Sequence, residues 1–255
     1  MRKLMQINLN PSCLMGSVSE SYWETVTMIR LLVGILAFVI NQVYRDRPMP
    51  RFYVLETVAR VPYFSYLSVL HLYETLGLWR KADWLKVHFA ESWNELHHLL
   101  IMEELGGSQN WIDRVFARSV ALVYYWIVVA LYVVHPRAAY NFMELVEGHA
   151  YRSYDKYLKT NKQYLEGQPA PQVAVNYYRD GDLYMFDEFQ ASRKPEERRP
   201  KIDNLYDVFV AIRDDEAEHV KTMVACQRPN AQLTLNSPHS VCAIEENGSE
   251  LAPNS

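Results

Sequence analysis

Residues 94–98 read NELHH and residues 215–219 read DEAEH, so the chain carries two Glu-x-x-His pairs. Positions i and i+3 lie on one face of a helix, so Glu95 points the same way as His98, and Glu216 the same way as His219. Two such pairs, completed by one glutamate from each of two other helices, form a carboxylate-bridged metal pair inside a four-helix bundle. The sequence therefore predicts an all-α bundle that holds two metal ions.

Helical periodicity extends over most of the chain, and glycine is scarce, with 9 residues in 255. Pro48 and Pro50 separate the first helix from the second, and Pro62 is expected to kink the second. Gly106 and Gly107 are expected to end the third helix. We expect helices roughly over residues 20–44, 50–77, 81–105, 111–147 (or a shorter helix broken at Pro136), 138–165 and 202–226.

The metal-binding domain is expected over residues 20–226. Residues 1–19 are expected to be a flexible segment, too polar for a secretory signal and too poor in arginine for an organelle transit peptide. Residues 227–255 are rich in Asn, Ser and Pro, which predicts a disordered tail. Residues 186–201 are charged and carry proline, which predicts an exposed insertion.

Composition excludes several classes of protein. The net charge is −4 and no basic stripe is present, so we expect no nucleic-acid partner. The three cysteines, Cys13, Cys226 and Cys242, have no Cys-x-x-Cys spacing and are expected to be unpaired thiols. The 18 tyrosines and 6 tryptophans suit membrane interfaces and quinone-type pockets as well as cores.

Two apolar runs, residues 31–40 and 120–134, are flanked by arginines. Both are shorter than the ~20 residues that a spanning helix needs. They predict additional apolar helices that lie in one leaflet and form a monotopic, interfacial membrane face. Two buried core helices are the equally weighted alternative, and a tilted spanning helix is a third.

The lone glutamate before the first pair is either Glu56 or Glu74. Glu56 stands in the apolar stretch YVLETVA, residues 53–59. A buried carboxylate there would cost several kcal/mol unless it were neutralised or bound to a metal. Glu74 lies near a helix end beside Gly77, which fits a surface position. Glu56 is therefore the stronger candidate.

The lone glutamate between the two pairs is either Glu144 or Glu147, and spacing does not separate them. Tyr154 lies seven residues after Glu147, two turns along the same face. A tyrosine there could donate a hydrogen bond or an electron to metal-bound oxygen, or it could simply fill the core.

His71, His88, His135 and His149 are expected to be structural residues or to support the ligands, although His88 shares a face with Glu95, as does Glu91. His97 points about 100° away from the phase of Glu95 and His98. Four carboxylates and two imidazoles, with no thiolate, suit iron or manganese, and we expect two Fe ions.

Three motifs, LET at 55–57, NELHH at 94–98 and RDDEAEH at 213–219, resemble in this order the ligand motifs of the alternative oxidase superfamily. Longer runs over residues 51–64, 82–107 and 198–219 resemble its plastid terminal oxidase branch, as does the insertion before Asn204. The resemblance covers roughly residues 25–225. It implies a ferritin-like four-helix bundle.

The resemblance also implies a role for each site residue. The implied metal ligands are Glu56, Glu95, His98, Glu147, Glu216 and His219. Tyr154 matches the tyrosine near the di-iron centre. Asn94 and Asp215 match positions that lie just behind the metal ligands and support them, and Arg51 and Leu55 match the quinol pocket. Cys13 does not match the regulatory cysteine of mitochondrial members.

The implied activity is a quinol:oxygen oxidoreductase that oxidises plastoquinol, reduces O₂ to water and pumps no protons. The implied setting is a homodimer on membrane lipid, held in the thylakoid membrane of a cyanobacterium or a chloroplast. The alternatives are a ubiquinol-type alternative oxidase, another di-iron membrane hydroxylase, or an iron-binding ferritin-like protein that is no enzyme.

Overall fold

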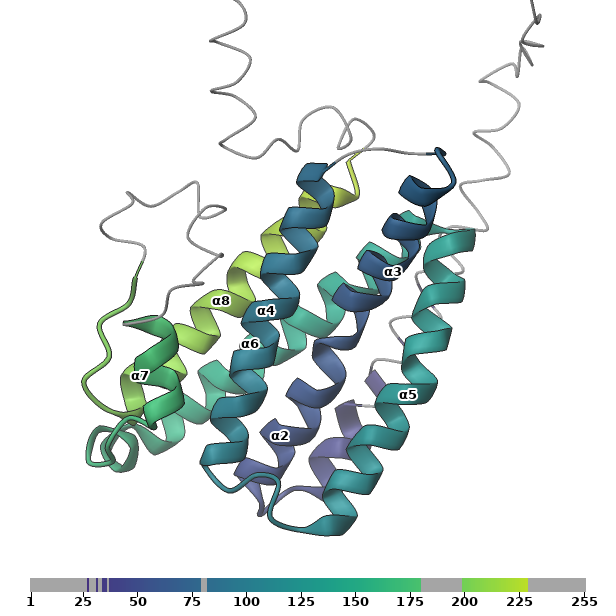
Figure 1. Ribbon diagram of the computed structural model, residues 1–255. Coiled ribbons are helices and arrows are strands. Elements are labelled where there is room, and N and C mark those ends of the chain that lie inside the picture. The colour runs from purple at the N-terminus through teal and green to yellow at the C-terminus, as the bar shows by residue number, and fades with distance from the viewer. Residues whose placement is uncertain are drawn as a thin grey trace, which may run out of the picture.

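The computed structural model describes residues 37–78, 82–179 and 199–228, together with positions 27, 31, 34 and 35. This part of the chain is helical and contains no strand, which confirms the expected all-α class (Figure 1). The helices named here are α2 (Pro48–Ala59), α3 (Val61–Thr75), α4 (Ala82–Glu104), α5 (Trp111–Val134), α6 (Pro136–Glu166), α7 (Gln172–Tyr178) and α8 (Leu205–Cys226).

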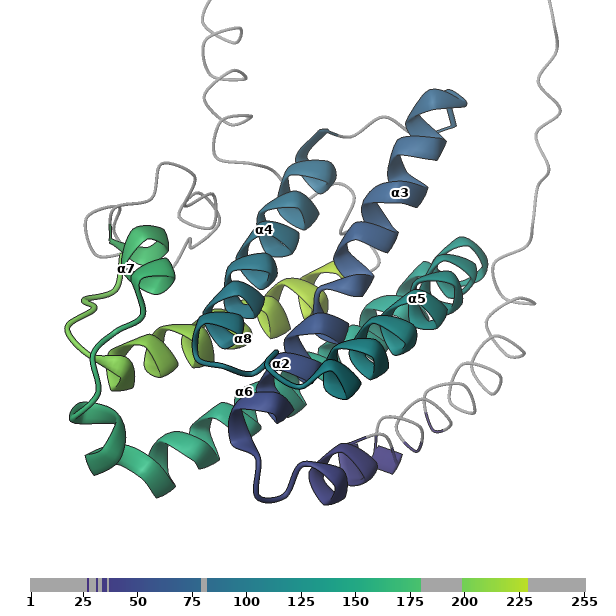
Figure 2. The same ribbon diagram turned by 60° about the horizontal axis from the view of Figure 1, so that its bottom comes forward.

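The bundle has four helical members. The consecutive helices α2 and α3 together form one member, and α4, α6 and α8 are the other three. α6 packs along α8, and α4 packs against α2, α3 and α8. α5 lies on the outside of the bundle, against α2, α3 and α6 (Figures 1 and 2). The short helix α7 lies against α4.

Two prolines divide the long helical stretches. Pro62 has no N–H to donate into the preceding turn, and the expected kink appears as a break at Arg60 between α2 and α3. Pro136 begins α6, and His135 before it leaves the helical region with φ −148° and ψ 76°. The longer expectation, one helix over 111–147, is therefore wrong, and the break at Pro136 is correct.

The turn after α4 is as expected, and it fixes the start of α2. Gly106 has φ +85°, a conformation that favours glycine, and Gly107 N–H donates to the Met102 carbonyl at 2.8 Å. A Cβ on Gly107 would lie 2.7 Å from the Tyr53 Cβ and 2.8 Å from the Met49 carbonyl oxygen. Only glycine allows this close approach between the turn and α2.

Helix α7 was not predicted from the sequence. The Glu104 carboxylate, at the end of α4, accepts hydrogen bonds at 2.9 Å from the backbone N–H groups of Gln172 and Val173, which start α7. α7 thereby places Tyr177 and Tyr178, both buried, against the bundle.

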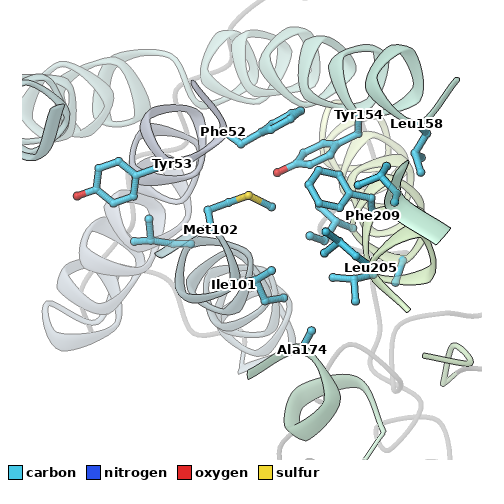
Figure 3. Packing of buried hydrophobic residues seen from close by; sticks show 14 of the residues in the cluster. Phe52, Tyr53, Ile101, Met102, Tyr154, Leu158, Ala174, Leu205 and Phe209 are labelled. Atoms are coloured by element: carbon cyan, nitrogen blue, oxygen red, sulfur yellow. The ribbon is translucent and has the colours of Figure 1, made fainter. Parts of the chain in front are cut away.

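The buried apolar residues form two clusters, one on each side of the acidic residues described below. The first cluster contains Phe52, Tyr154 and Phe209, with Tyr154 stacked on Phe52 at a ring distance of 4.4 Å (Figure 3). The second cluster contains Tyr63 and Tyr140. Three expectations lie outside the described residues: segment 1–19, most of the insertion at 186–201, and the tail after 228.

Candidate metal centre

Six buried side chains from the helices α2, α4, α6 and α8 form two overlapping groups. Glu56 comes from α2, Glu95 and His98 from α4, Glu147 from α6, and the remaining pair from α8. Oxygen or nitrogen atoms lie within 4.8 Å of one another inside each group. The first group is Glu56, Glu95, His98 and Glu216, and the second is Glu95, Glu147, Glu216 and His219.

The two groups share Glu95 and Glu216, so these two carboxylates stand where they could bridge two metal ions. His98 Nδ1 lies 3.3 Å from Glu216 Oε1 and 3.6 Å from Glu95 Oε1. His219 Nδ1 lies 3.0 Å from Glu95 Oε1. Glu56 and Glu147 each belong to one group only, which suits terminal ligands.

Most of the buried glutamate oxygens in these two groups accept no hydrogen bond from the described part of the protein, so a cation would be a better partner for them. Among the described residues, none donates a hydrogen bond to either oxygen of Glu95 or Glu216, or to Oε2 of Glu56 and of Glu147. A buried carboxylate oxygen without a partner costs about 1–3 kcal/mol, and more when charged. Two divalent cations would satisfy these oxygens and balance four carboxylate charges.

Burial and mutual repulsion change the acidity of these groups when no cation is bound. Burial raises the pKa of Glu56 to about 8, against the lowering effect of the nearby His98 imidazole. Burial and the charges of Glu216 and Glu95 raise the pKa of Glu147 well above its usual value. Both carboxylates therefore hold a proton more tightly than a solvent-exposed glutamate does, and a metal pair would have to displace it.

The hydrogen bonds around Asp215 orient His98. Asp215 Oδ2 accepts hydrogen bonds from Asn94 Nδ2 at 2.9 Å, from the Tyr178 hydroxyl at 2.8 Å and from His98 Nε2 at 3.2 Å. Because Nε2 donates to this carboxylate, Nδ1 of His98 is left facing the acidic groups. Asn94 also donates to the Tyr177 oxygen at 2.9 Å. The unpredicted helix α7 therefore supports this side of the centre.

A tyrosine hydroxyl reaches each terminal carboxylate, in a crossed arrangement. Tyr154, seven residues after Glu147, donates to Glu56 Oε1 on another helix. Tyr63, seven residues after Glu56, donates to Glu147 Oε1 at 2.5 Å. Sequence reasoning missed Tyr63, although its seven-residue spacing from Glu56 repeats that of Tyr154 from Glu147 and could have found it.

The structure also separates residues that spacing left open. Glu144 lies outside both groups and accepts a hydrogen bond from Gln227 Nε2 at 2.7 Å. His97 points away and stacks on Tyr177 at a ring distance of 4.0 Å. His88 and Glu91 are buried but bind each other, His88 Nδ1 to Glu91 Oε2 at 3.0 Å, and belong to neither group.

The two residues expected at a quinol pocket line different pockets. Leu55 lines a narrow, mostly apolar cavity of about 50 Å³ with Glu56, His149 and Phe142. Arg51 lines a neighbouring, more polar pocket of about 390 Å³. Ligand pockets usually measure ~300–1,000 Å³, so side chains around Leu55 must move before a ring can enter.

Known proteins from plants are similar to this chain in sequence. The family profile described as "Alternative oxidase" matches residues 11–228. The protein "Ubiquinol oxidase 4, chloroplastic/chromoplastic" of Arabidopsis thaliana is 57% identical over 243 residues, which cover 92% of this chain and 68% of that relative. "Ubiquinol oxidase, mitochondrial" of Mangifera indica is 32% identical over 198 residues, which cover 77% of this chain and 54% of the relative.

A third relative, "Ubiquinol oxidase 2, mitochondrial" of Glycine max, is 30% identical over 198 residues, and the match covers 51% of its length. The chain thus spans about half to two thirds of the length of these curated relatives. The profile match and the high identity to the chloroplast relative agree with the family resemblance inferred from the sequence. The chain belongs to the alternative oxidase family, in its plastid terminal oxidase branch.

Proposed function

We propose that this protein is a quinol:oxygen oxidoreductase that oxidises plastoquinol and reduces O₂ to water with two bound Fe ions. The observation that carries the proposal is the buried set of four glutamates and two histidines in two groups that share two carboxylates. The names of the relatives, all quinol oxidases, support the reaction class.

Glu56 and His98 would hold one ion, and Glu147 and His219 would hold the other. Glu95 and Glu216 would contact both. When bound, the metal pair supplies the chemistry that transfers electrons from a quinol to O₂. The protein keeps this chemistry in a buried site from which water is excluded, where charges interact strongly.

The remaining site residues orient the ligands or donate hydrogen bonds to them. Asp215 and Asn94 hold the His98 ring in place. The Tyr154 hydroxyl donates to Glu56 and can supply a proton or an electron at that carboxylate. Burial, with the positive charges of Arg152 and Arg51, lowers the pKa of His149, whose ring lines the same cavity as Leu55.

The apolar surface of α5 supports membrane binding. Its large exposed apolar residues form adjacent pairs that recur at spacings of four and seven positions, which places them on one face: Trp111, Ile112, Val115, Phe116, Leu122, Val123, Trp126, Ile127, Val133 and Val134. The segment 37–43 before α2 also exposes Phe38, Val39 and Val43. Both Tyr44 and Arg47 bind the buried Asp113 carboxylate of α5, which ties the segment to this helix.

By length and composition, α5 is the one helix among the described residues that could cross a membrane, which leaves the alternative of a tilted spanning helix open. α5 nevertheless packs along α2, α3 and α6. A spanning α5 would carry the flank of the bundle into the lipid. We therefore propose that α5 lies in one leaflet. The chloroplast location in the name of the Arabidopsis thaliana relative supports a plastid membrane, such as the thylakoid membrane. The homodimer stays a prediction.

Replacing both Trp126 and Ile127 with glutamate is expected to weaken binding to liposomes by ~10²-fold or more, because apolar contact with the lipid is lost. The two side chains are 65% and 57% exposed. The same change at the exposed Val224 of α8 is the control. Flotation with liposomes measures the binding of both variants.

Single cysteines at Asn110 and His135, in a cysteine-free background, should be labelled by an impermeant reagent from the same membrane side. Labelling from opposite sides would show that α5 spans.

Oxygen uptake by the purified, iron-loaded protein tests the proposed function. Short-chain analogues of plastoquinol and ubiquinol should each be supplied with no reductase present. We expect uptake with the plastoquinol analogue at the higher kcat/KM. Uptake that needs an added reductase would instead indicate a di-iron hydroxylase, and higher kcat/KM with the ubiquinol analogue would overturn the choice of quinol.

A further inference from the structure

A second buried hydrogen-bonded network lies beyond Glu147 and takes no part in the proposed metal coordination. Tyr140 on α6, His88 and Glu91 on α4 and Tyr132 on α5 are each at most 3% exposed. Tyr140 Oη lies 2.9 Å from His88 Nε2 and 2.7 Å from Tyr132 Oη. These side chains come from three different helices, α4, α5 and α6.

The network assigns a direction to each hydrogen bond. The Glu91 carboxylate is an acceptor only, so His88 Nδ1 carries the proton and donates to it at 3.0 Å. His88 Nε2 is then the unprotonated nitrogen and accepts from the Tyr140 hydroxyl. Tyr132 in turn donates to the Tyr140 oxygen. The result is a phenol with its own base, and a carboxylate that stabilises that base when it becomes charged.

Aromatic rings connect this network to the metal centre. Tyr63, which donates to Glu147, lies 6.5 Å from Tyr66 between ring centroids. Tyr66 lies 5.1 Å from Tyr140 and 4.6 Å from Tyr132. The rings of these four residues are buried among apolar side chains. Neighbouring phenol rings at such distances allow an electron to move in short steps.

Tyr66 differs from Tyr140 in what receives its proton. The Tyr66 hydroxyl donates to the backbone carbonyl of Ala139 at 3.0 Å, and a carbonyl does not take up a phenol proton. Burial and the neighbouring Tyr132 raise the pKa of Tyr140 well above its usual value, so its phenol is protonated at rest. An electron hole that moves along the chain therefore becomes trapped at Tyr140, where the proton has an acceptor.

We propose that Tyr140 is a redox-active tyrosine that stores one oxidising equivalent away from the metal centre, with His88 as the acceptor of its proton. This inference rests on the proposed function for the oxidant, which is the metal pair after reaction with O₂. Tyr140 loses one electron through Tyr66 and Tyr63 to the metal pair, and its proton moves to His88 Nε2. The products are a neutral tyrosyl radical and an imidazolium paired with Glu91.

An oxidising equivalent stored at Tyr140 would be useful because electrons reach the metal centre two at a time. Reduction of O₂ to water takes four electrons, whereas one quinol supplies two. When the second quinol arrives late, a missing electron can come from Tyr140, and the oxidising equivalent then leaves the ligands undamaged. The next quinol returns the electron by the same rings, and the proton returns from His88 to the phenol oxygen.

Electron paramagnetic resonance tests the proposal. Iron-loaded protein is reduced, exposed to O₂ without quinol and frozen, and we expect a tyrosyl radical signal. With 3-fluorotyrosine at position 140 the signal should acquire fluorine hyperfine splitting. Tyr140→Phe should reduce the signal to background, and His88→Gln should reduce its yield several-fold. Tyr125→Phe, on α5 outside the chain of rings, is the matched control.

A photo-oxidant flash on iron-free protein provides a readout that needs no turnover, and it too should yield the fluorine-coupled radical. Protein that oxidises quinol but shows no fluorine splitting in either experiment would overturn the proposal and leave the oxidase function intact. A fluorine-coupled radical after the flash, in protein that consumes no O₂ when loaded, would support a redox-active Tyr140 and overturn the proposed function instead.

Discussion

Replacing Glu216 with alanine is expected to remove both iron ions, whereas replacing Glu147 with alanine is expected to remove only one. Glu216 belongs to both groups of ligands and Glu147 to one. Either variant should reduce quinol-dependent oxygen uptake by ~10²-fold or more, because a metal contributes several kcal/mol to such a reaction and each 1.4 kcal/mol is a factor of ten. Iron per chain after gel filtration measures the first effect, and an oxygen electrode the second.

Glu144→Ala is the matched control for this experiment. Glu144 is one helical turn from Glu147, but its carboxylate binds Gln227 and Asn141. This variant should retain both irons. Glu216→Gln, which conserves shape, guards against misfolding, and circular dichroism should show unchanged helix content. Two retained irons in folded Glu216→Gln and Glu216→Ala would contradict a shared ligand at this position.

The choice between Glu144 and Glu147 shows where sequence reasoning stops. Both residues lie on one helix three positions apart, so local periodicity gives them nearly the same direction. The rotation of α6 against α8 decides between them, and that rotation depends on packing along the whole length of both helices. By contrast, the pairing of Glu95 with His98 depends only on the turn of a single helix, and spacing alone was enough to predict it.

Tyr63 and helix α7 illustrate the same limit. The bend at Arg60 turns α3 so that Tyr63 reaches Glu147 on α6, and no local pattern encodes which carboxylate lies across the bundle. α7 is seven residues long, too short to form without tertiary contacts, and its start depends on Glu104 of a distant segment. The break at Pro62 and the stop at Gly106 were predictable because each follows from the backbone of one residue.

Replacing Tyr154 with phenylalanine is expected to slow oxygen uptake by ~10²–10⁴-fold, the usual contribution of a positioned proton donor. Its hydroxyl donates to Glu56, and its ring stacks on Phe52 and contacts Phe209. The substitution removes the hydroxyl and retains both ring contacts. The free energy of unfolding should therefore change by only about 1 kcal/mol, and iron content should stay at two per chain.

A functional role and a packing role for Tyr154 predict different outcomes here. If the tyrosine only fills the core, Tyr154→Phe should retain wild-type uptake, because phenylalanine fills the same space. Tyr164→Phe, an exposed tyrosine on the same helix, controls for the change of residue type. Glu147, Tyr154 and Tyr164 all lie on α6, so a change in this helix could also displace the ligand Glu147. The iron content of each variant must therefore be measured together with its rate of oxygen uptake. Full iron, unchanged stability and a lost rate would together assign the effect to the hydroxyl at Glu56.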